Sequence, residues 1–316
     1  MNTFGFSIDP DIAKRKKELE TLDKIRNLKS RIIDLEKTAS ILYDDVEPYT
    51  GPKVVVYGGT EACYKDMERS AKMLLANSHI DKIYFLIDDD KFPTTLPDII
   101  ECINVHDQVY YPKWSPNYMY PVSYMTLMRH VLYDMMPEYD RVLWLDGDTL
   151  VMDDISDLFN TPMGDYYYFA AAEENRHYLQ YTSNRKIEDV QAAYHDITLE
   201  PSQYFNAAVL LINSKLLRES GFGEQLVNRM NNYLIYYCDQ TLINEMCRDR
   251  IYSLGFEWNT SHATGEVKMP RIIHLSSGEL TPYAKGAIEV FDALSFDEIM
   301  NLRKAREEAG ILNGKK

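Results

Sequence analysis

Two aspartates separated by one glycine, Asp146-Gly147-Asp148, are the residues of this chain whose types and spacing point most directly to chemistry. They follow an apolar run, Arg141 to Leu145, so that a buried strand ends abruptly in two carboxylates. Two acids at such a place repel each other unless a cation neutralises them. Hard oxygen ligands suit Mg²⁺, Ca²⁺ or Mn²⁺, and the glycine lets a ligand approach the backbone. The turn is therefore predicted to be a metal site, with an ordinary surface acid pair as the alternative.

The segments around this turn alternate between strand and helix. Lys53–Tyr57 and Lys82–Ile87 are apolar runs typical of buried strands, and Lys65–Asn77 between them has helical spacing. This order predicts a parallel sheet, whose ligands bind beyond the carboxyl ends of its strands. Further strands are expected at Cys102–Val105, Arg141–Leu145, Tyr166–Ala172 and Phe205–Ile212, and helices at Tyr120–Met136, Ile155–Phe159, Leu216–Met230 and Gln240–Asp249.

The two ends of the chain differ from this alternating region. Residues 11–42 have leucines and isoleucines three or four apart, which predicts an amphipathic helix that either docks or oligomerises, or packs along the main domain. A capping-box pattern at Ser295 predicts a structural helix over Phe296–Ala309. The expected domains are an N-terminal extension over residues 1–47, the main domain over residues 52–285, and a helical tail over residues 286–316.

Composition excludes several partners. The chain has 34 Lys and Arg against 49 Asp and Glu, a net charge of −15, which disfavours duplex nucleic acid and anionic membranes. No apolar run approaches the roughly 20 residues that cross a bilayer, and the first residues lack a secretory pattern, so a cytoplasmic protein is expected. The four cysteines are scattered and are expected to be free thiols.

Four blocks of the sequence resemble glycosyltransferase family 8. Tyr139–Val151, followed by Asp154–Phe159, is similar to the family's Asp-x-Asp segment. The other blocks follow in the family's order: Phe205–Asn213, Asp239–Asn244, and Ile272–Gly278 leading to Thr281-Pro282-Tyr283. The resemblance covers about Lys53 to Tyr283. It implies the GT-A fold, a mixed and mainly parallel α/β sheet flanked by helices, and a retaining enzyme that moves glucose or galactose from a UDP-sugar to a glycan or protein acceptor.

The resemblance also implies roles for individual residues. Asp146 and Asp148, with His274 as third ligand, would bind Mn²⁺ or Mg²⁺ together with the donor's diphosphate, a ligand set that suits Mn²⁺. Gln240 would support front-face substitution as an electrostatic group, and Asp239 would bind sugar hydroxyls. The remaining positions expected to contact the donor are Tyr57, Gly58, Gly59, Gly147, Asn206, Ala207 and Gly278.

From the residues alone, other interpretations stay open. Asp239 could cap a helix, Asn206 could make a strand-end hydrogen bond, and His274 could be a satisfied buried histidine. The other six histidines have no functional signal and are expected to be structural; they are His79, His106, His130, His177, His195 and His262.

The chain also departs from the family pattern. Thr126 stands where a helix usually presents an arginine, with Arg129 one turn later as a substitute. Thr281 replaces a lysine, with Lys285 nearby, and Ala208 replaces a glycine. These departures motivate a second hypothesis, a degenerate sugar-nucleotide-binding protein with a role in assembly.

A third hypothesis is a nucleotidyltransferase, although Gly58-Gly59-Thr60-Glu61 lacks the basic residue that such a loop would carry. The acceptor region, expected over Glu173–Pro201, has no readable pattern.

Overall fold

The computed structural model describes residues 48–119, 123–173, 204–235, 238–261, 267–275 and 281–312. The chain divides into two compact units, Met1–Pro48 and Tyr49–Lys316, and nearly all described residues belong to the second. The helix predicted over residues 11–42 lies outside the described residues, as does the predicted extension over residues 1–47.

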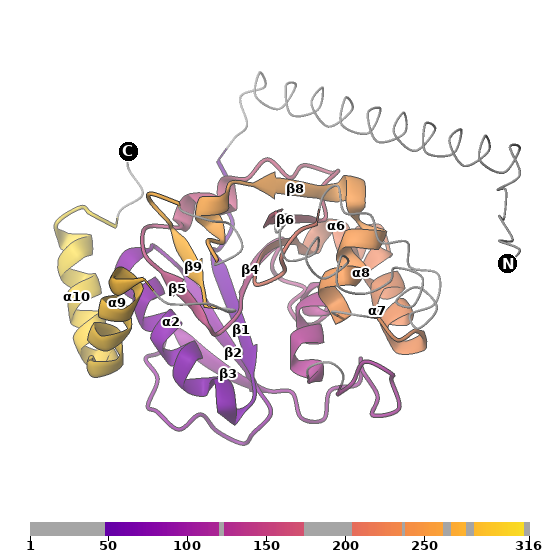
Figure 1. Cartoon of the computed structure of the whole chain (residues 1–316), viewed down its shortest axis with the longest axis horizontal. Helices are drawn as coiled ribbons and strands as arrows, with labels where there is room; N and C mark the ends of the chain where they lie inside the picture. The colour runs from indigo at the N-terminus through magenta and orange to yellow at the C-terminus, as the bar shows by residue number, and fades with distance from the viewer. Residues whose placement is uncertain are drawn as a thin grey trace, which may run out of the picture. The chain divides into compact units, whose positions relative to one another are not determined.

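A seven-stranded sheet forms the centre of the second unit (Figure 1). All neighbouring strands pair in parallel except β7, which runs antiparallel to both β4 and β6. The predicted mixed, mainly parallel α/β sheet is therefore confirmed. In spatial order the strands are β3 (Ile100–Asn104), β2 (Lys82–Ile87), β1 (Val54–Gly59), β4 (Arg141–Leu145), β7 (Val209–Asn213), β6 (Phe169–Ala172) and β8 (Ile251–Leu254).

Helices cover both faces of this sheet. Helix α2 (Tyr64–Asn77) packs with α9 (Pro282–Ala293) and α10 (Phe296–Glu308). Arg303 of α10 donates a hydrogen bond to the carbonyl of Ile80, in the loop that follows α2, and so ties α10 to the domain. On the opposite face lie the 3₁₀ helix η2 (Tyr124–His130), α3 (Leu132–Met135), α6 (Ser214–Glu219), α7 (Phe222–Asn232) and α8 (Cys238–Met246).

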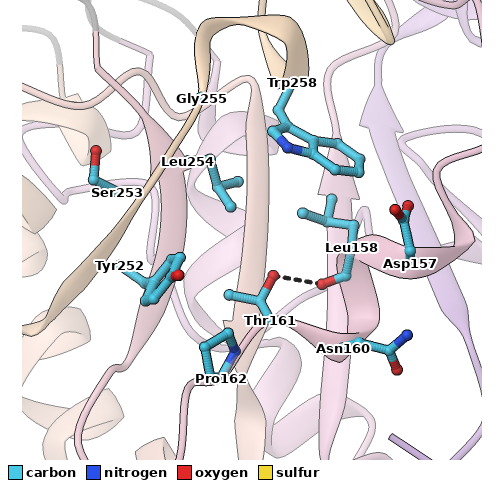
Figure 2. A pocket seen from close by; sticks show the side chains of 10 residues that line it. All are labelled: Asp157, Leu158, Asn160, Thr161, Pro162, Tyr252, Ser253, Leu254, Gly255 and Trp258. Carbon is cyan, nitrogen blue, oxygen red and sulfur yellow. Dashed lines mark hydrogen bonds between the residues drawn. The ribbon is translucent and has the colours of Figure 1, made fainter. Parts of the chain in front are cut away.

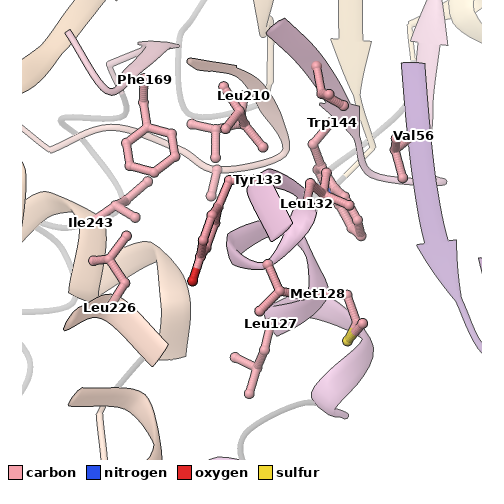
Figure 3. Close-up of a cluster of buried hydrophobic side chains, with 14 of the residues drawn as sticks. Val56, Leu127, Met128, Leu132, Tyr133, Trp144, Phe169, Leu210, Leu226 and Ile243 are labelled. Atoms are coloured by element: carbon pink, nitrogen blue, oxygen red, sulfur yellow. The ribbon is translucent and has the colours of Figure 1, made fainter. Parts of the chain in front are cut away.

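The main hydrophobic core lies between the sheet and this second set of helices (Figure 3). Alternation along β1 sorts its side chains, because successive residues of a strand point to opposite faces. Val54 and Val56 belong to this core, whereas Tyr57 turns to the other face, where its hydroxyl accepts a hydrogen bond from Ser70 of α2. Trp144 of β4 is fully buried in the same core and is its largest side chain.

A short second sheet has a direct bearing on the candidate metal ligands. Strand β5 (Thr149–Val151) follows the aspartate turn and pairs antiparallel with β9 (Ile272–His274). The register places Thr149 opposite His274 and Leu150 opposite Ile273. His274 is thereby brought next to the turn although it lies far along the chain.

Several predicted elements differ from those observed. The single helix expected over Tyr120–Met136 is wrong for its described part, because η2 and α3 are separate and meet at Val131. Local helix propensity is a weak force that tertiary contacts override, and here Arg129 and His130 of η2 both reach Asp239 of α8.

The helix expected over Leu216–Met230 is divided between α6 and α7, since Gly221 adopts a left-handed φ of 65° between them. The helix expected over Gln240–Asp249 is likewise α8 followed by the 3₁₀ helix η4 (Arg248–Arg250).

The strand expected over Tyr166–Ala172 begins only at Phe169. The preceding tyrosines lie outside regular secondary structure, and the Arg250 guanidinium stacks over the rings of Tyr166 and Tyr168. At the C-terminus, α10 has the predicted capping box at Ser295. Helix α9 was not expected, and it crosses the predicted domain boundary between residues 285 and 286.

Candidate metal and donor site

The aspartate turn is shaped by the end of β4 and the start of α2. The Asp146 backbone N–H donates to the Ala208 carbonyl at 2.8 Å, and the indole N–H of Trp144 donates to Asp146 Oδ1 at 2.7 Å. A Cβ on Gly147 would lie 2.8 Å from Met67 Cγ and 3.3 Å from the Met67 backbone nitrogen. Glycine is therefore required at this position by the close approach of α2.

Asp146, Asp148 and His274 form a compact group, the acidic triad. One ligand atom from each lies within 4.8 Å of the others, and His274 Nε2 is 3.5 Å from Asp148 Oδ1. The pairing of β5 with β9 holds the triad together, since the Leu275 N–H donates to the Asp148 carbonyl at 3.0 Å. Two carboxylates and one imidazole are a donor set that fits a divalent ion such as Mn²⁺. The structure thus brings together all three predicted metal ligands.

The two carboxyl groups of the triad have opposite electrostatic surroundings. Burial raises the pKa of Asp146, and the negative charge of Asp148 raises it further, against the opposing guanidinium of Arg129. Burial also acts to raise the pKa of Asp148, but the contact with His274 outweighs it and holds that pKa below its usual range. A carboxyl group that resists ionisation beside another carboxylate gains from a bound cation.

Arg129, His130 and Asp239 form a second group, the arginine cluster. Arg129 is 3% exposed, and its Nε lies 3.0 Å from Asp239 Oδ2 while its Nη2 lies 3.1 Å from Asp146 Oδ1. Its Nη1 donates to the Ala207 carbonyl, and the guanidinium stacks over the Trp144 ring. One arginine therefore connects the end of β4, the loop before β7 and the start of α8.

Arg129 provides a positive charge near the place where the sequence has Thr126 instead of the expected arginine. Thr126, where an arginine was expected, donates its hydroxyl to the Ser123 carbonyl and stays within its own helix. Thr281 caps α9 by accepting a hydrogen bond from the Ala284 N–H, while Lys285 is exposed on that helix. Arg129 thus supplies a buried cation next to the triad, as the sequence suggested as a substitute.

Asp239 and Gln240 lie in the first turn of α8. Asp239 is the second residue of that helix and does not occupy its cap position; burial acts to raise its pKa, but Arg129 and then His130 hold it below its usual range. The residue before it, Cys238, has a left-handed φ of 51°, which is uncommon for a residue with a Cβ. The Gln240 side-chain oxygen accepts from the Ala207 N–H at 3.1 Å, which fixes its amide beside the arginine cluster.

Asn206 and Ala207 belong to the loop that leads into β7. The Asn206 side-chain oxygen accepts hydrogen bonds from the Ala208 N–H at 2.9 Å and from the Asn259 amide at 2.8 Å. This is the strand-end role that the sequence left open for Asn206. Ala207 contacts both Arg129 and Gln240 through its backbone, so its contribution to the site does not depend on its side chain.

The predicted nucleoside end of the site is at β1. Gly58 and Gly59 close this strand, with Gly58 against the Trp144 ring and Gly59 against Cys63 and Met67. The Tyr57 side chain is fully buried, and burial raises the pKa of its hydroxyl. Only the backbone of Tyr57 is therefore in a position to meet a ligand. Gly278 lies outside the described residues.

The sequence did not single out His130 or Trp144, both of which contact the site. His130 is 1% exposed, and its Nε2 lies 3.6 Å from Asp239 Oδ2. A signal was present, because Arg129 and His130 interrupt the apolar stretch from Leu127 to Tyr133. Adjacent polar residues inside such a stretch need buried partners.

A pocket of about 320 Å³ lies at the edge strand β8 (Figure 2). Leu254, Trp258 and Leu158 supply its apolar lining, and Asp157, Asn160 and Ser253 supply polar groups. Arg271 stacks over Trp258 and pairs with Asp157 at 2.6 Å. None of the predicted site residues lines this pocket, so it is separate from the triad.

Comparisons with known proteins agree with this geometry. The profile of glycosyl transferase family 8 matches residues 2–275. The glycosyltransferase GlyE of Streptococcus pneumoniae is 27% identical over 220 residues, which are 66% of this chain and 47% of GlyE. A putative glycosyltransferase of Haemophilus influenzae is 26% identical over 164 residues, 48% of this chain and 46% of that protein. The chain thus spans about half the length of these curated relatives.

Solved structures show the same fold. The bifunctional glycosyltransferase WbbM superposes with a TM-score of 0.59 at 18% identity, covering 81% of this chain and 52% of WbbM. The galactosyltransferase LgtC, in complex with donor and acceptor sugar analogs, superposes with a TM-score of 0.54 at 18% identity, covering 82% of this chain and all of LgtC. The architecture is therefore the GT-A fold of glycosyltransferases.

The family match and the triad lead to one assignment. This chain belongs to glycosyltransferase family 8. Among its described residues, no helix is both long and apolar enough to span a membrane.

Proposed function

We propose that this protein is a retaining hexosyltransferase that moves glucose or galactose from a UDP-sugar to a glycan or protein acceptor, assisted by Mn²⁺ or Mg²⁺. The acidic triad carries the proposal, because its three ligand atoms converge within 4.8 Å at the end of a buried strand. Family membership supports the transfer of a sugar over the transfer of a nucleotidyl group.

The charges around the triad favour a divalent ion. Among the described residues, the carboxylates of Asp146 and Asp239 pair with a single guanidinium, that of Arg129. Asp148 contacts His274 and feels the charge of Arg129 from farther away. Three carboxylates beside one permanent cation leave two negative charges uncompensated by arginine or lysine at this place. A divalent cation balances them, and it also offsets the acidic net charge of −15 for a diphosphate ligand.

Each residue then has a defined task. Asp146, Asp148 and His274 would hold the metal ion, which as a Lewis acid stabilises the leaving nucleoside diphosphate. Trp144 orients Asp146 through its indole N–H, and Arg129 fixes Asp146 relative to Asp239. Asp239 is ionised and buried, which suits it to accept hydrogen bonds from sugar hydroxyls.

Gln240 supports substitution on the face of the sugar from which the diphosphate leaves. Its amide is a poor nucleophile, and its oxygen already accepts a hydrogen bond from Ala207. An amide dipole held in this way can stabilise the positive charge that develops on the sugar without forming a covalent bond. The neighbouring Asn244 bonds the backbone of Phe205 at 2.7 and 2.8 Å and fixes α8 against the loop before β7.

The test is a screen of UDP-glucose and UDP-galactose for UDP release, with and without Mn²⁺. We expect Mn²⁺-dependent release from one of them by the native protein. The double variant Asp146→Ala with Asp148→Ala should release UDP about 10³-fold more slowly, because the metal ion contributes several kcal/mol to stabilising the transition state. The matched control is Asp98→Ala with Asp153→Ala, two exposed aspartates, which should keep native activity. Unchanged release in the triad variant would refute the proposal.

The second candidate, a sugar-nucleotide-binding protein without turnover, has one supporting observation. Thr281 caps a helix where a lysine was expected, and Lys285 is exposed on that helix. Calorimetry separates the two functions, because tight UDP-sugar binding without UDP release under any acceptor would favour the second. The buried Arg129 beside the triad favours the first.

A further inference from the structure

The pocket at strand β8 has no task in the proposed reaction, although its lining has the composition of a ligand-binding site (Figure 2). Its volume is about 320 Å³, and the buried Leu158 and Leu254 form its apolar part together with the partly buried ring of Trp258. Small-molecule sites combine such an apolar lining with a few polar groups. In the described part of the chain, neither the indole N–H of Trp258 nor the hydroxyl of Tyr252 has a hydrogen-bond partner. The pocket therefore offers two hydrogen-bond donors beside an apolar surface.

The charges around the pocket are balanced. Asp157 is the only charged residue among the described residues that line it, and Arg271 pairs with this carboxylate at 2.6 Å. The guanidinium of Arg271 also stacks over the Trp258 ring, 4.5 Å from its centroid. Neither an anion nor a cation would find an uncompensated charge here, so the pocket fits a neutral ligand. A hexose unit of a glycan is such a ligand, since it presents C–H groups on its face and hydroxyl groups at its rim.

Two segments lead from this pocket to the donor site. Trp258 is followed by Asn259, whose side-chain amide donates to Asn206 Oδ1 at 2.8 Å. Arg271 immediately precedes β9, which ends at His274 of the acidic triad. Since a strand rises about 3.3 Å per residue, Arg271 lies about 10 Å from His274 along this strand. An oligosaccharide of a few units is therefore long enough to extend from the pocket to the donor site.

A peptide is the alternative ligand, because β8 is the edge strand of the seven-stranded sheet as described and an extended peptide can pair with such an edge. The strand spans only four residues, Ile251–Leu254, however, and a short edge strand offers few backbone groups for pairing. The side-chain donors and the balanced charge favour a sugar.

We propose that the β8 pocket is a secondary saccharide site, which binds one neutral hexose unit of a glycan acceptor while the end of the same glycan lies at the donor site. This inference rests on the proposed function, and it selects a glycan over a protein as the acceptor. It also assigns a ligand to a pocket that none of the donor-site residues lines.

The test measures binding of the native protein and its variants to an array of neutral and acidic oligosaccharides, followed by calorimetry with the neutral oligosaccharide that the native protein binds most tightly. Trp258→Ala should bind this oligosaccharide about tenfold more weakly, because it loses both apolar contact area and the indole N–H. Tyr252→Phe removes only a hydroxyl group and should weaken binding about fivefold, the effect of one hydrogen bond. This second variant keeps the ring that packs against Tyr167, so it tests the pocket even if Trp258→Ala is unstable.

The control variant is Trp114→Ala, at a tryptophan that is 72% exposed and lies outside the pocket, and it should bind as the native protein does. In Mn²⁺ without an acceptor, both pocket variants should release UDP from the accepted UDP-hexose at the native rate. The inference is overturned if the native protein binds no neutral oligosaccharide, if it binds only acidic ones, or if both pocket variants bind as tightly as the native protein. Failure of the proposed function has a different signature, because the native protein would then release no UDP from either UDP-hexose, whatever it binds on the array.

Discussion

The acidic triad and the arginine cluster are joined by the contact of Arg129 with Asp146, yet the carboxyl groups of Asp146 and Asp239 differ in electrostatic state. Burial acts to raise the pKa of both Asp146 and Asp239. Asp239 has Arg129 and His130 around it, and its pKa falls below the usual value, whereas Asp146 also faces Asp148 and its pKa rises. Next to the same arginine, the negative charge of the carboxylate is therefore favoured at Asp239 and disfavoured at Asp146.

This difference separates a carboxylate whose charge is balanced by protein groups from a carboxylate whose charge calls for a bound cation. The arginine cluster is close to balanced within the protein, as a folded core requires. The triad keeps excess negative charge at the end of a strand, where binding a cation would relieve it. Four experiments test how far this separation holds, beginning with the largest effect.

Replacing Asp239 with Ala should destabilise the protein by about 3 kcal/mol, because the buried guanidinium of Arg129 would lose one of its two carboxylate partners. Urea unfolding followed by circular dichroism measures this. Asp98→Ala, at an exposed aspartate, is the control and should differ from native by less than about 0.5 kcal/mol. A loss of similar size in both variants would mean that the arginine cluster is not a structural ion pair.

Mn²⁺ should stabilise the native protein by about 2.7 kcal/mol at a free concentration one hundred times its dissociation constant. Asp148→Asn should abolish this gain, because it removes a triad ligand. His130→Leu should keep it, since His130 contacts Asp239 and none of the triad. The measurement is the unfolding midpoint with and without Mn²⁺, and a gain retained by Asp148→Asn would place the ion elsewhere.

The pH dependence of stability should report the lowered pKa of Asp239. When folding lowers the pKa of a carboxyl group, the group stabilises the protein fully at pH values above its pKa in the unfolded chain. This stabilisation is lost as the pH falls toward and through its pKa in the folded protein. The difference in unfolding free energy between native and Asp239→Asn should therefore be constant from pH 7 to pH 5. The difference should shrink only below about pH 3.8, the ordinary pKa of an aspartate. A difference that already disappears near pH 6 would contradict the assignment.

The smallest effect is expected for Asp146→Asn in the absence of metal. The amide keeps an oxygen for the Trp144 indole and removes the repulsion from Asp148. Its unfolding free energy at pH 7 should equal or exceed the native value by up to about 1 kcal/mol. With Mn²⁺ present, the native protein should have the larger unfolding free energy of the two. A clear destabilisation without metal would show that the charge of Asp146, like that of Asp239, stabilises the folded protein.

The elements that could be predicted are those with a local signal. Strands β2 and β4 were predicted with their observed bounds, because each is a short apolar run that ends in polar residues. The capping box of α10 was predicted from a four-residue pattern. The conformation of the region from Ser123 to Met136 was not predicted correctly, since it depends on the contacts of Arg129 and His130 with α8.

The sequence by itself determined the aspartate turn, the alternation of strands and helices, and the four blocks that identify the family, since these depend on residues that are neighbours in the chain. Only the tertiary structure decided which groups meet at the site. The pairing of β5 with β9 brings His274 to Asp148, and the packing of η2 against α8 brings Arg129 and His130 to Asp239. Electrostatic interactions depend on distance and burial rather than on sequence separation, so the opposite pKa shifts of Asp146 and Asp239 follow from the fold alone.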